Sequence, residues 1–271
     1  MTDQTPVPPV HIAGTAAPRV PAAVPPRMPA ARAHNATKTY GDGSTQVTAL
    51  DAVDVVFHAG QFSAIMGPSG SGKSTLMHCL AGLDQLSSGT VFIGDTELTG
   101  LNESELTRLR RDSVGFIFQA FNLVPTLTAY ENIALPAQLA GTKLDTPWVD
   151  HVIATVGLAD RIDHRPNELS GGQQQRVAVA RALASRPGII FADEPTGNLD
   201  SGTGTAILEF MRHAVTELGQ TIVMVTHDAT AASFSDRVVF LSDGRIAGEL
   251  AQPSADAIHD AFRSIGPKVG S

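Results

Sequence analysis

Short apolar runs alternate with segments of helical spacing along most of this chain. Runs of strand length, apolar throughout or alternating with polar residues, occupy residues 47–57, 62–66, 90–93, 114–118, 189–192 and 221–225. Helical patterns occupy residues 73–83, 103–111, 172–184 and 203–218. Residues 237–241 and 245–250 flank Asp243-Gly244, a dipeptide typical of a two-residue hairpin turn. Strands that alternate with helices predict an α/β fold with a mainly parallel sheet covered on both faces.

The middle of the chain breaks this alternation. Residues from about 128 to 160 are helical in pattern and contain no strand. Pro136 is expected to kink or break the helical stretch, because proline lacks the N–H that an interior helical position needs. The pattern therefore predicts a helical subdomain inserted over about residues 120–185.

The two ends of the chain are expected to lie outside the folded domain. Prolines recur through residues 1–33, with alanine and valine between them and no helical or strand period. This composition predicts a disordered or polyproline-like extension, which is either a solvated tail or a segment that docks on a partner. The folded domain is expected to begin near Ala36 and to span residues 34–250, and residues 251–271 are expected to form a short tail.

Length and composition fit one large α/β domain and narrow the function classes. The chain has 271 residues, and its net charge of −8 argues against a nucleic-acid partner, which needs a basic face. The single cysteine, Cys79, allows no intrachain disulfide and suits a reducing compartment. No apolar run approaches the roughly 18 residues that span a bilayer, and no apolar signal core opens the chain. A membrane function would therefore need a partner that carries the spans.

One glycine-rich loop predicts phosphate binding. Residues 67–74 match the pattern G-x-x-x-x-G-K-[ST] between a predicted strand and a predicted helix. In such a loop, backbone N–H groups surround phosphate oxygens and the helix N-terminus adds partial positive charge. Lys73 is expected to reach the β- and γ-phosphates, and Ser74 to give its hydroxyl to Mg²⁺. The residues expected to bind nucleotide here are Gly67, Pro68, Ser69, Gly70, Ser71, Gly72, Lys73, Ser74 and Thr75.

Two adjacent carboxylates end another predicted strand. The apolar run 189–192 leads into Asp193 and Glu194, and ligands of open α/β sheets bind at the carboxyl ends of strands. Asp193 is therefore placed to hold Mg²⁺ through its water shell. Glu194 is expected to point in a different direction from Asp193 and can polarise an attacking water. Such help from a general base is worth about 10²–10⁴-fold in rate.

The residues Leu169-Ser170-Gly171-Gly172-Gln173 resemble the LSGGQ signature of the ABC ATPase family. The resemblance extends over about residues 40–250, nearly the whole folded part. It implies an ATPase that uses ATP and Mg²⁺. The implied fold is a P-loop NTPase core with a mainly parallel sheet, an N-terminal antiparallel β-subdomain and an inserted α-helical subdomain.

The resemblance also implies roles for residues outside these motifs. Tyr40 looks like the aromatic side chain that stacks on adenine, an interaction worth about 1–3 kcal/mol. Gln119 looks like the glutamine that touches Mg²⁺ and links the core to the helical subdomain. Asp200 belongs to residues 197–200, which look like the family's D-loop, and His227 looks like the histidine that contacts the γ-phosphate. Without the resemblance, Tyr40, Gln119 and His227 would be a half-buried aromatic, a polar residue at a strand end and a structural histidine.

The signature implies a homodimer. Ser170 and the glycines after it open a predicted helix and can form a second anion site. In the family, Ser170, Gly171, Gly172 and Gln173 would close over the nucleotide that the other subunit holds. Two ATP molecules would then join the dimer, and hydrolysis would let it separate.

A more detailed resemblance covers residues 106–132. It points to the ATPases of lipoprotein release, macrolide export and antimicrobial-peptide resistance, a group that includes a cell-division ATPase regulating wall hydrolases. These pair with few-span permeases that have large external domains, so the expected place is the cytoplasmic face of the cell membrane. Phe121, Leu123 and Pro125 would line a groove for a permease helix, or would simply pack on the helical subdomain.

Three other classes of ATP-binding protein fit this sequence less well. An ABC protein of DNA repair would need a long coiled coil between the phosphate loop and the signature, where this chain has a compact insert. A translation factor would carry two cassettes, and only one phosphate loop is present here. A P-loop kinase for small molecules would need no signature. The sequence therefore favours a transport or mechanotransmission ATPase.

Overall fold

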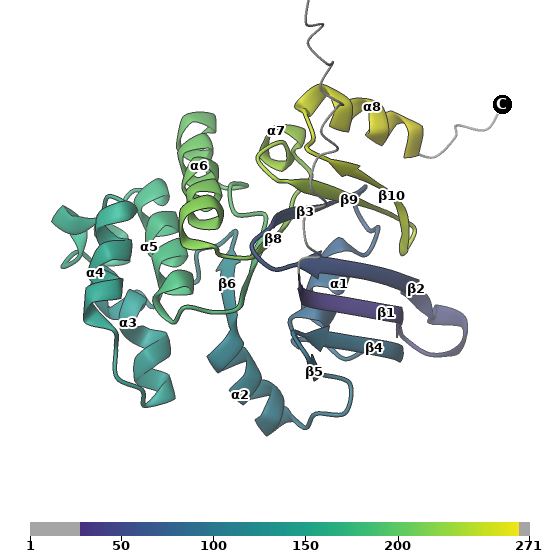
Figure 1. The fold of residues 1–271 in the computed structure, drawn as a ribbon, viewed down its shortest axis with the longest axis horizontal. Coiled ribbons are helices and arrows are strands. Elements are labelled where there is room, and N and C mark those ends of the chain that lie inside the picture. The colour runs from purple at the N-terminus through teal and green to yellow at the C-terminus, as the bar shows by residue number, and fades with distance from the viewer. Residues whose placement is uncertain (1–27, 266–271) are drawn as a thin grey trace, which may run out of the picture.

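The computed structural model describes residues 28–265, in which the strands form a six-stranded and a four-stranded sheet (Figure 1). The expected extension over residues 1–33 therefore lies mostly outside the described residues. The strands are β1 (Pro29–Tyr40), β2 (Val47–His58), β3 (Phe62–Met66), β4 (Ser88–Ile93), β5 (Thr96–Glu97), β6 (Val114–Phe118), β7 (Ile189–Asp193), β8 (Ile222–Val225), β9 (Arg237–Ser242) and β10 (Arg245–Ala251).

The larger sheet carries the core and has the strand order β10-β9-β3-β8-β7-β6. Strands β9, β3, β8, β7 and β6 run parallel, and β10 pairs antiparallel with β9. Alternate residues of each strand enter two apolar clusters: Phe62 of β3 belongs to one and Ile65 to the other. Because both faces are covered, every residue of β3 is buried, as expected for a central parallel strand. The α/β fold with a mainly parallel sheet is confirmed.

The smaller sheet is antiparallel and has the order β2-β1-β4-β5. Strand β1 begins at Pro29, so regular structure starts before the boundary near Ala36 that the sequence predicted. Register shifts interrupt its pairing with β2, and Asn35 has a left-handed φ of 46°. These irregularities remove the strict alternation that would have identified a strand in the sequence.

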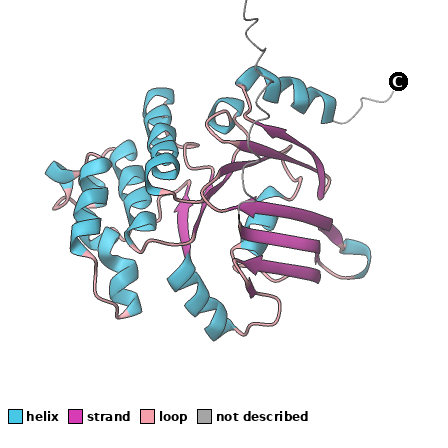
Figure 2. Cartoon of the chain, viewed as in Figure 1, coloured by secondary structure: helices cyan, strands magenta, loops and turns pink. Residues whose placement is uncertain are grey.

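The helices lie at both sides of the larger sheet (Figure 2). They are α1 (Lys73–Leu80), α2 (Glu103–Ser113), α3 (Ala129–Ala140), α4 (Thr146–Thr155), α5 (Gly171–Ala184), α6 (Ser201–Leu218), α7 (Ala229–Ala232) and α8 (Ala255–Ile265), with short 3₁₀ turns at Gly43–Thr45, Ala159–Arg161 and Pro166–Glu168. Helices α3, α4 and α5 gather at one end of the molecule, and α1 lies behind β1 and β2 (Figure 1).

Pro136 does not break the helical middle of the chain. It lies inside α3, which continues to Ala140. The break falls at Gly141, whose φ of 63° is left-handed and whose N–H bonds to the carbonyls of Ala137 and Gln138. Glycine ends the helix because it takes this conformation without a Cβ penalty.

Helix α8 occupies part of the predicted tail. Ile258 is fully buried, and Ala261, Phe262 and Ile265 pack against the same cluster. This spacing of three and four residues is helical, and α8 packs on α7. The part of the predicted tail that the structure describes, up to Ile265, therefore packs on the domain.

Asn132 of α3 joins this helix to the segment before it. Its side chain is fully buried. The amide nitrogen donates to the carbonyls of Val124, Leu127 and Thr128 at 3.1, 3.2 and 2.9 Å, and the amide oxygen accepts from the Val124 N–H at 2.8 Å. The buried amide thus satisfies four backbone groups at once.

Asn132→Ala should lower the free energy of unfolding by about 2–4 kcal/mol, because the Val124 N–H and the Leu127 carbonyl lose their partner and a buried side chain is truncated. Urea denaturation of the full chain measures this change. Gln138→Ala removes an exposed amide from the same helix and is the control, with an expected change within about 0.5 kcal/mol. Equal stability of the two variants would contradict this account of Asn132.

Candidate nucleotide-binding site

The phosphate loop joins the buried strand β3 to α1. Gly72 precedes α1 with a φ of 98°, and a Cβ there would lie 2.2 Å from the Ala49 carbonyl oxygen, so only glycine fits. Lys73 points back over the loop, where its Nζ donates to the Pro68 carbonyl at 2.7 Å. The loop therefore presents the N-terminus of α1 together with one lysine, an arrangement suited to phosphate.

Lys73, Ser74 and Asp193 share one electrostatic environment. Burial lowers the pKa of Lys73, against the opposing charges of Glu194 and Asp193. Burial raises the pKa of Asp193, while the charges of His78 and Lys73 and a hydrogen bond from Ser74 lower it. The end of β7 and the start of α1 are thus in contact through Ser74 and Asp193. The influence of His78 was not expected from the sequence.

Glu194 and His227 form a pair. His227 Nδ1 lies 2.8 Å from Glu194 Oε1, although the residues are 33 positions apart in the chain. Strands β7 and β8 are parallel neighbours, with Asp193 beside Val225, so the residues that follow them meet. Glu194 has a left-handed φ of 46°, and its N–H donates to the Val225 carbonyl at 2.9 Å. The glutamate is consequently held at its backbone and at its carboxylate.

Gln119 follows β6 and contacts Asn198. Its Nε2 donates to Asn198 Oδ1 at 3.2 Å, and Asn198 Nδ2 donates to the Gln119 carbonyl at 2.9 Å. Within residues 28–265, no hydrogen bond joins the Gln119 side chain to Ser74 or Asp193. The structure thus brings Gln119 to the residues that precede α6, a contact that the sequence did not predict.

The loop after Gln119 is held by Arg181 of α5. Phe121 and Asn122 have left-handed φ values of 60° and 50°. The Arg181 guanidinium donates to the Phe121 carbonyl at 2.8 Å and to the Asn122 carbonyl at 2.6 Å. Burial lowers the pKa of Arg181. This arginine was missed because no spacing relates it to a loop some 60 residues earlier.

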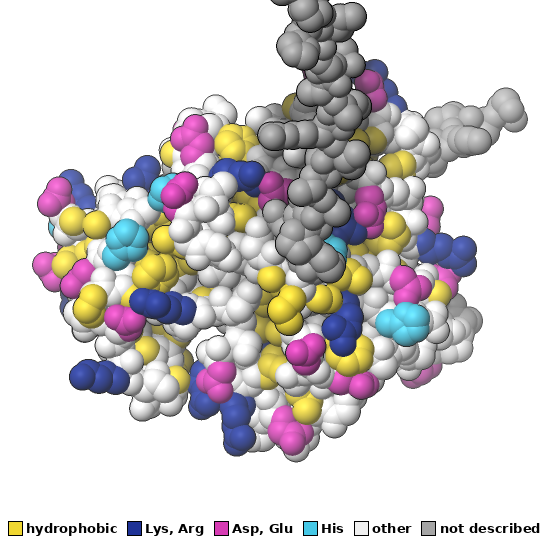
Figure 3. Space-filling view, viewed as in Figure 1, with side chains coloured by type: hydrophobic (Ala, Val, Ile, Leu, Met, Phe, Trp, Pro, Cys, Tyr) yellow, Lys and Arg dark blue, Asp and Glu magenta, His cyan; other side chains and the backbone are white. Residues whose placement is uncertain are grey.

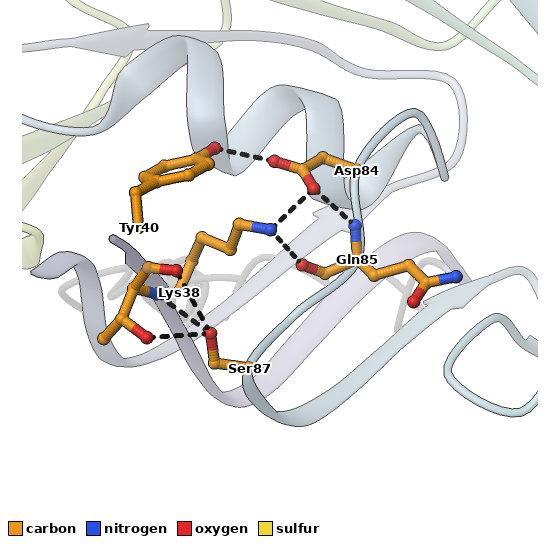
Figure 4. Close-up of polar contacts among 6 residues, drawn as sticks. Lys38, Tyr40, Asp84, Gln85 and Ser87 are labelled. Carbon is orange, nitrogen blue, oxygen red and sulfur yellow. Dashed lines mark hydrogen bonds and ion pairs between the residues drawn. The ribbon is translucent and has the colours of Figure 1, made fainter. Parts of the chain in front are cut away.

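Tyr40 lies at the end of β1 with 44% of its surface exposed. Its hydroxyl donates to Asp84 Oδ2 at 2.6 Å, and Lys38 Nζ bonds to Asp84 Oδ1 at 2.6 Å (Figure 4). Burial opposes the ionised form of Asp84, but the bonds from Lys38 and Tyr40 outweigh it and lower the pKa. Burial and the contact with Asp84 raise the pKa of Tyr40, while Thr75 of α1 acts in the opposite direction and lowers it. An exposed aromatic ring is therefore fixed beside the phosphate loop.

The signature residues begin α5. Ser170 caps the helix: its Oγ accepts from the Gln173 N–H at 3.3 Å, and Gln173 Oε1 accepts from the Ser170 N–H at 2.9 Å. A Cβ on Gly172 would lie 2.2 Å from Thr203 of α6, so the two helices approach closely here. Asp200 caps α6 through Thr203, which lowers the Asp200 pKa. Helix α5 belongs to the group of helices away from α1 (Figure 1), and within residues 28–265 the hydrogen bonds of Ser170 join it to its own helix.

A groove of about 560 Å³ lies between β6, α2, α3 and α5. Its lining includes Leu83 and Leu139, which are 45% and 77% exposed, together with Arg181. Phe121, Leu123 and Pro125, the residues expected from the sequence, are not part of this lining, and Leu123 packs against the larger core cluster.

The side chains present fit a nucleotide and a hard cation. Ser71 Oγ is buried in the phosphate loop and has no hydrogen-bond partner among residues 28–265, which leaves a polar atom for a ligand. Oxygen donors from Ser74, Asp193 and Gln119 suit Mg²⁺, which takes few protein ligands and keeps phosphate and water oxygens. No group of three or more His, Cys, Asp or Glu side chains in residues 28–265 could hold a metal ion by itself.

Comparisons with known proteins show the family of this chain. A family model described as ABC transporter matches residues 50–197. The ABC transporter ATP-binding protein MJ0796 of Methanocaldococcus jannaschii is 45% identical over 222 residues, which cover 79% of this chain and 94% of MJ0796. A dimeric post-hydrolysis structure of MJ0796 bound to ADP and Pi matches with a TM-score of 0.74 and 42% identity, covering 83% of this chain and 99% of that chain.

One relative is much longer than this chain. The macrolide export ATP-binding/permease protein MacB of Burkholderia pseudomallei is 45% identical over 232 residues, which cover 85% of this chain. The same match covers only 35% of MacB.

The fold, the phosphate loop and the paired strand-end carboxylates define a nucleoside-triphosphate-binding P-loop protein. The chain belongs to the ABC transporter family, as an ATP-binding cassette that hydrolyses ATP.

Tyr40→Ala should weaken ATP binding about tenfold, because it removes the ring available for stacking on adenine. Tyr40→Phe keeps the ring but loses the bond to Asp84, so a smaller loss of about two- to threefold is expected. Equilibrium titration with a fluorescent ATP analogue measures both affinities. Unchanged binding by Tyr40→Ala would show that adenine lies elsewhere.

Proposed function

We propose that this chain is the ATP-driven motor of a membrane permease, working as a homodimer on the cytoplasmic face of the membrane. Export, or the transmission of force to an external domain, is the proposed outcome. The family assignment and the name of MacB, a macrolide export ATP-binding/permease protein, support this direction. Among the described residues no helix is both long and apolar enough to cross a bilayer.

The separation of Ser170 from the phosphate loop carries the proposal. Ser170 is the N-cap of α5, and this helix lies with α3 and α4 at the end of the molecule away from α1 (Figure 1). An anion site at Ser170 is therefore complete only when a second copy brings its own phosphate loop to it. The dimeric structures of MJ0796 support such an arrangement.

In this proposal each side chain has one task. Lys73 leaves the Pro68 carbonyl and binds the β- and γ-phosphates. Ser74, Asp193 and the amide oxygen of Gln119 would hold Mg²⁺, which would neutralise charge on the phosphates when bound. Glu194 orients and polarises the attacking water, and His227, already paired with Glu194, contacts the γ-phosphate.

The groove lined by Leu83, Leu139 and Arg181 is the proposed contact with the permease. Exposed leucines in a groove are unfavourable in water and favour a partner surface. Arg181 lines this groove and also holds the loop after Gln119. A movement of the permease segment bound in the groove would therefore move that loop. No nucleic acid partner is proposed, since acidic and basic side chains are interspersed on the face in Figure 3 and the net charge is −8.

Glu194→Gln should bind ATP, dimerise and hydrolyse ATP at least about 100-fold more slowly, because the water loses its base. Phosphate release measures hydrolysis and light scattering measures the dimer. Wild-type turnover by this variant would contradict the role of Glu194.

The same variant, locked with ATP, tests the partner. A pull-down from native membranes should recover a membrane protein with few spans and a large external domain. Recovery of a ribosomal or nucleic-acid-bound partner without any membrane protein would leave the ATPase intact and overturn the transport function.

Ser170→Arg should abolish hydrolysis while its own phosphate loop still binds ATP, because a bulky side chain blocks the shared site without reaching Lys73. Nucleotide binding and phosphate release are measured on the same preparation. Full activity in this variant would refute the site shared between two copies.

A further inference from the structure

Gln119 and Asn198 form a reciprocal pair that fixes the direction of both amides. Asn198 Nδ2 donates to the Gln119 main-chain carbonyl at 2.9 Å. Asn198 Oδ1 accepts from Gln119 Nε2 at 3.2 Å. The Asn198 amide contributes both its nitrogen and its oxygen, while Gln119 contributes its side-chain nitrogen and its main-chain carbonyl oxygen. Reversing either amide would place two like atoms face to face.

The main-chain carbonyl is the reference point of this pair. A carbonyl oxygen can only accept, so Asn198 must present its nitrogen to Gln119 O and its oxygen to the Gln119 side chain. The Gln119 side chain must then direct its nitrogen to Asn198. Its oxygen, Oε1, is left pointing away from Asn198, and no hydrogen bond engages it among residues 28–265.

The packing of Gly197 supports the same arrangement. A Cβ on Gly197 would lie 2.8 Å from Gln119 Nε2 and 3.1 Å from Cδ. The amide of Gln119 therefore lies directly against the backbone of residue 197, and a larger residue there would displace it. Residues 197 and 198 together define where the amide lies and which of its ends is free.

We propose that Asn198 is a positioning residue for the divalent cation, because it orients the Gln119 amide so that the oxygen is the end available to the metal. Only an amide oxygen ligates a hard cation, since the amide nitrogen carries hydrogens and no free lone pair. The proposal rests on the cation-binding role proposed for Gln119. It adds that Asn198, which does not touch the metal, selects the ligating atom.

Asn198 lies on a segment that leads from Gln119 to the signature helix. Asn198 lies two residues before Asp200, which caps α6, and α6 contacts the signature helix at Thr203 and Gly172. A shift of residues 197–200 would break the two hydrogen bonds and release the orientation of Gln119. Cation affinity then depends on the position of this segment.

The test measures cation binding without turnover. In the full-length Glu194→Gln chain with ATP, the dissociation constant of Mn²⁺ is measured by electron paramagnetic resonance. Asn198→Ala should weaken Mn²⁺ binding about five- to tenfold, because the amide loses its fixed orientation. Binding of a fluorescent ATP analogue in EDTA should stay unchanged, and Gln138→Ala, which removes an exposed amide far from the pair, should change neither value.

The same Asn198→Ala change, made in a Gln119→Glu chain, distinguishes an orienting role of Asn198 from simple support of the local structure. The carboxylate of Gln119→Glu has two oxygen atoms, so either can bind the cation and no neighbour is needed to select the ligating atom. Asn198→Ala should therefore cause no further loss of Mn²⁺ binding in the Gln119→Glu chain. A loss of the same size in both backgrounds would mean that Asn198 only supports the local structure, and the proposal would fail.

The remaining outcomes distinguish this proposal from the proposed function. If Gln119→Ala weakens Mn²⁺ binding and Asn198→Ala does not, the orienting role of Asn198 is wrong and the role of Gln119 stands. If Gln119→Ala leaves Mn²⁺ binding unchanged, Gln119 is not a ligand, and both its proposed role and that of Asn198 fall.

Discussion

Burial of β3 on both faces is the constraint on which the rest of the molecule depends. Two apolar clusters pack against opposite faces of this strand, with Phe62 in one and Ile65 in the other. The parallel neighbours β8, β7 and β6 follow in register, so their carboxyl ends form one edge. That edge gathers Lys73, Glu194 and Gln119 from three distant parts of the chain, as ligand sites of open α/β sheets require.

The polar side chains at this edge already have partners within the chain. Lys73 bonds to the phosphate loop itself, Glu194 to His227, and Gln119 to Asn198. A net hydrogen bond contributes only about 0.5–1.5 kcal/mol, so the phosphates of a nucleotide can replace the Pro68 carbonyl as the partner of Lys73 at small cost. Such partners keep the site ordered while leaving its side chains available.

The parts of the site that follow one another in sequence could be predicted, and the parts assembled by tertiary contacts could not. The phosphate loop and the strand before Asp193 are contiguous, so their patterns sufficed. Asp84 contacts Tyr40 across 44 positions and Arg181 contacts Phe121 across 60, and no local pattern encodes either contact. In the fold, the bulged β1 lacked a regular alternation. The helical middle ended at a glycine, although its internal proline was the stronger apparent breaker.

Cys79 of α1 lies in the smaller core cluster, where burial raises the pKa of its thiol to about 12. At neutral pH almost none of this thiol is ionised, and the thiolate is the form that reacts with alkylating reagents. The sequence contains no other cysteine. A cysteine introduced at the surface would therefore accept a spin label or fluorophore selectively, and distances between two copies could be followed in solution without removing the native thiol.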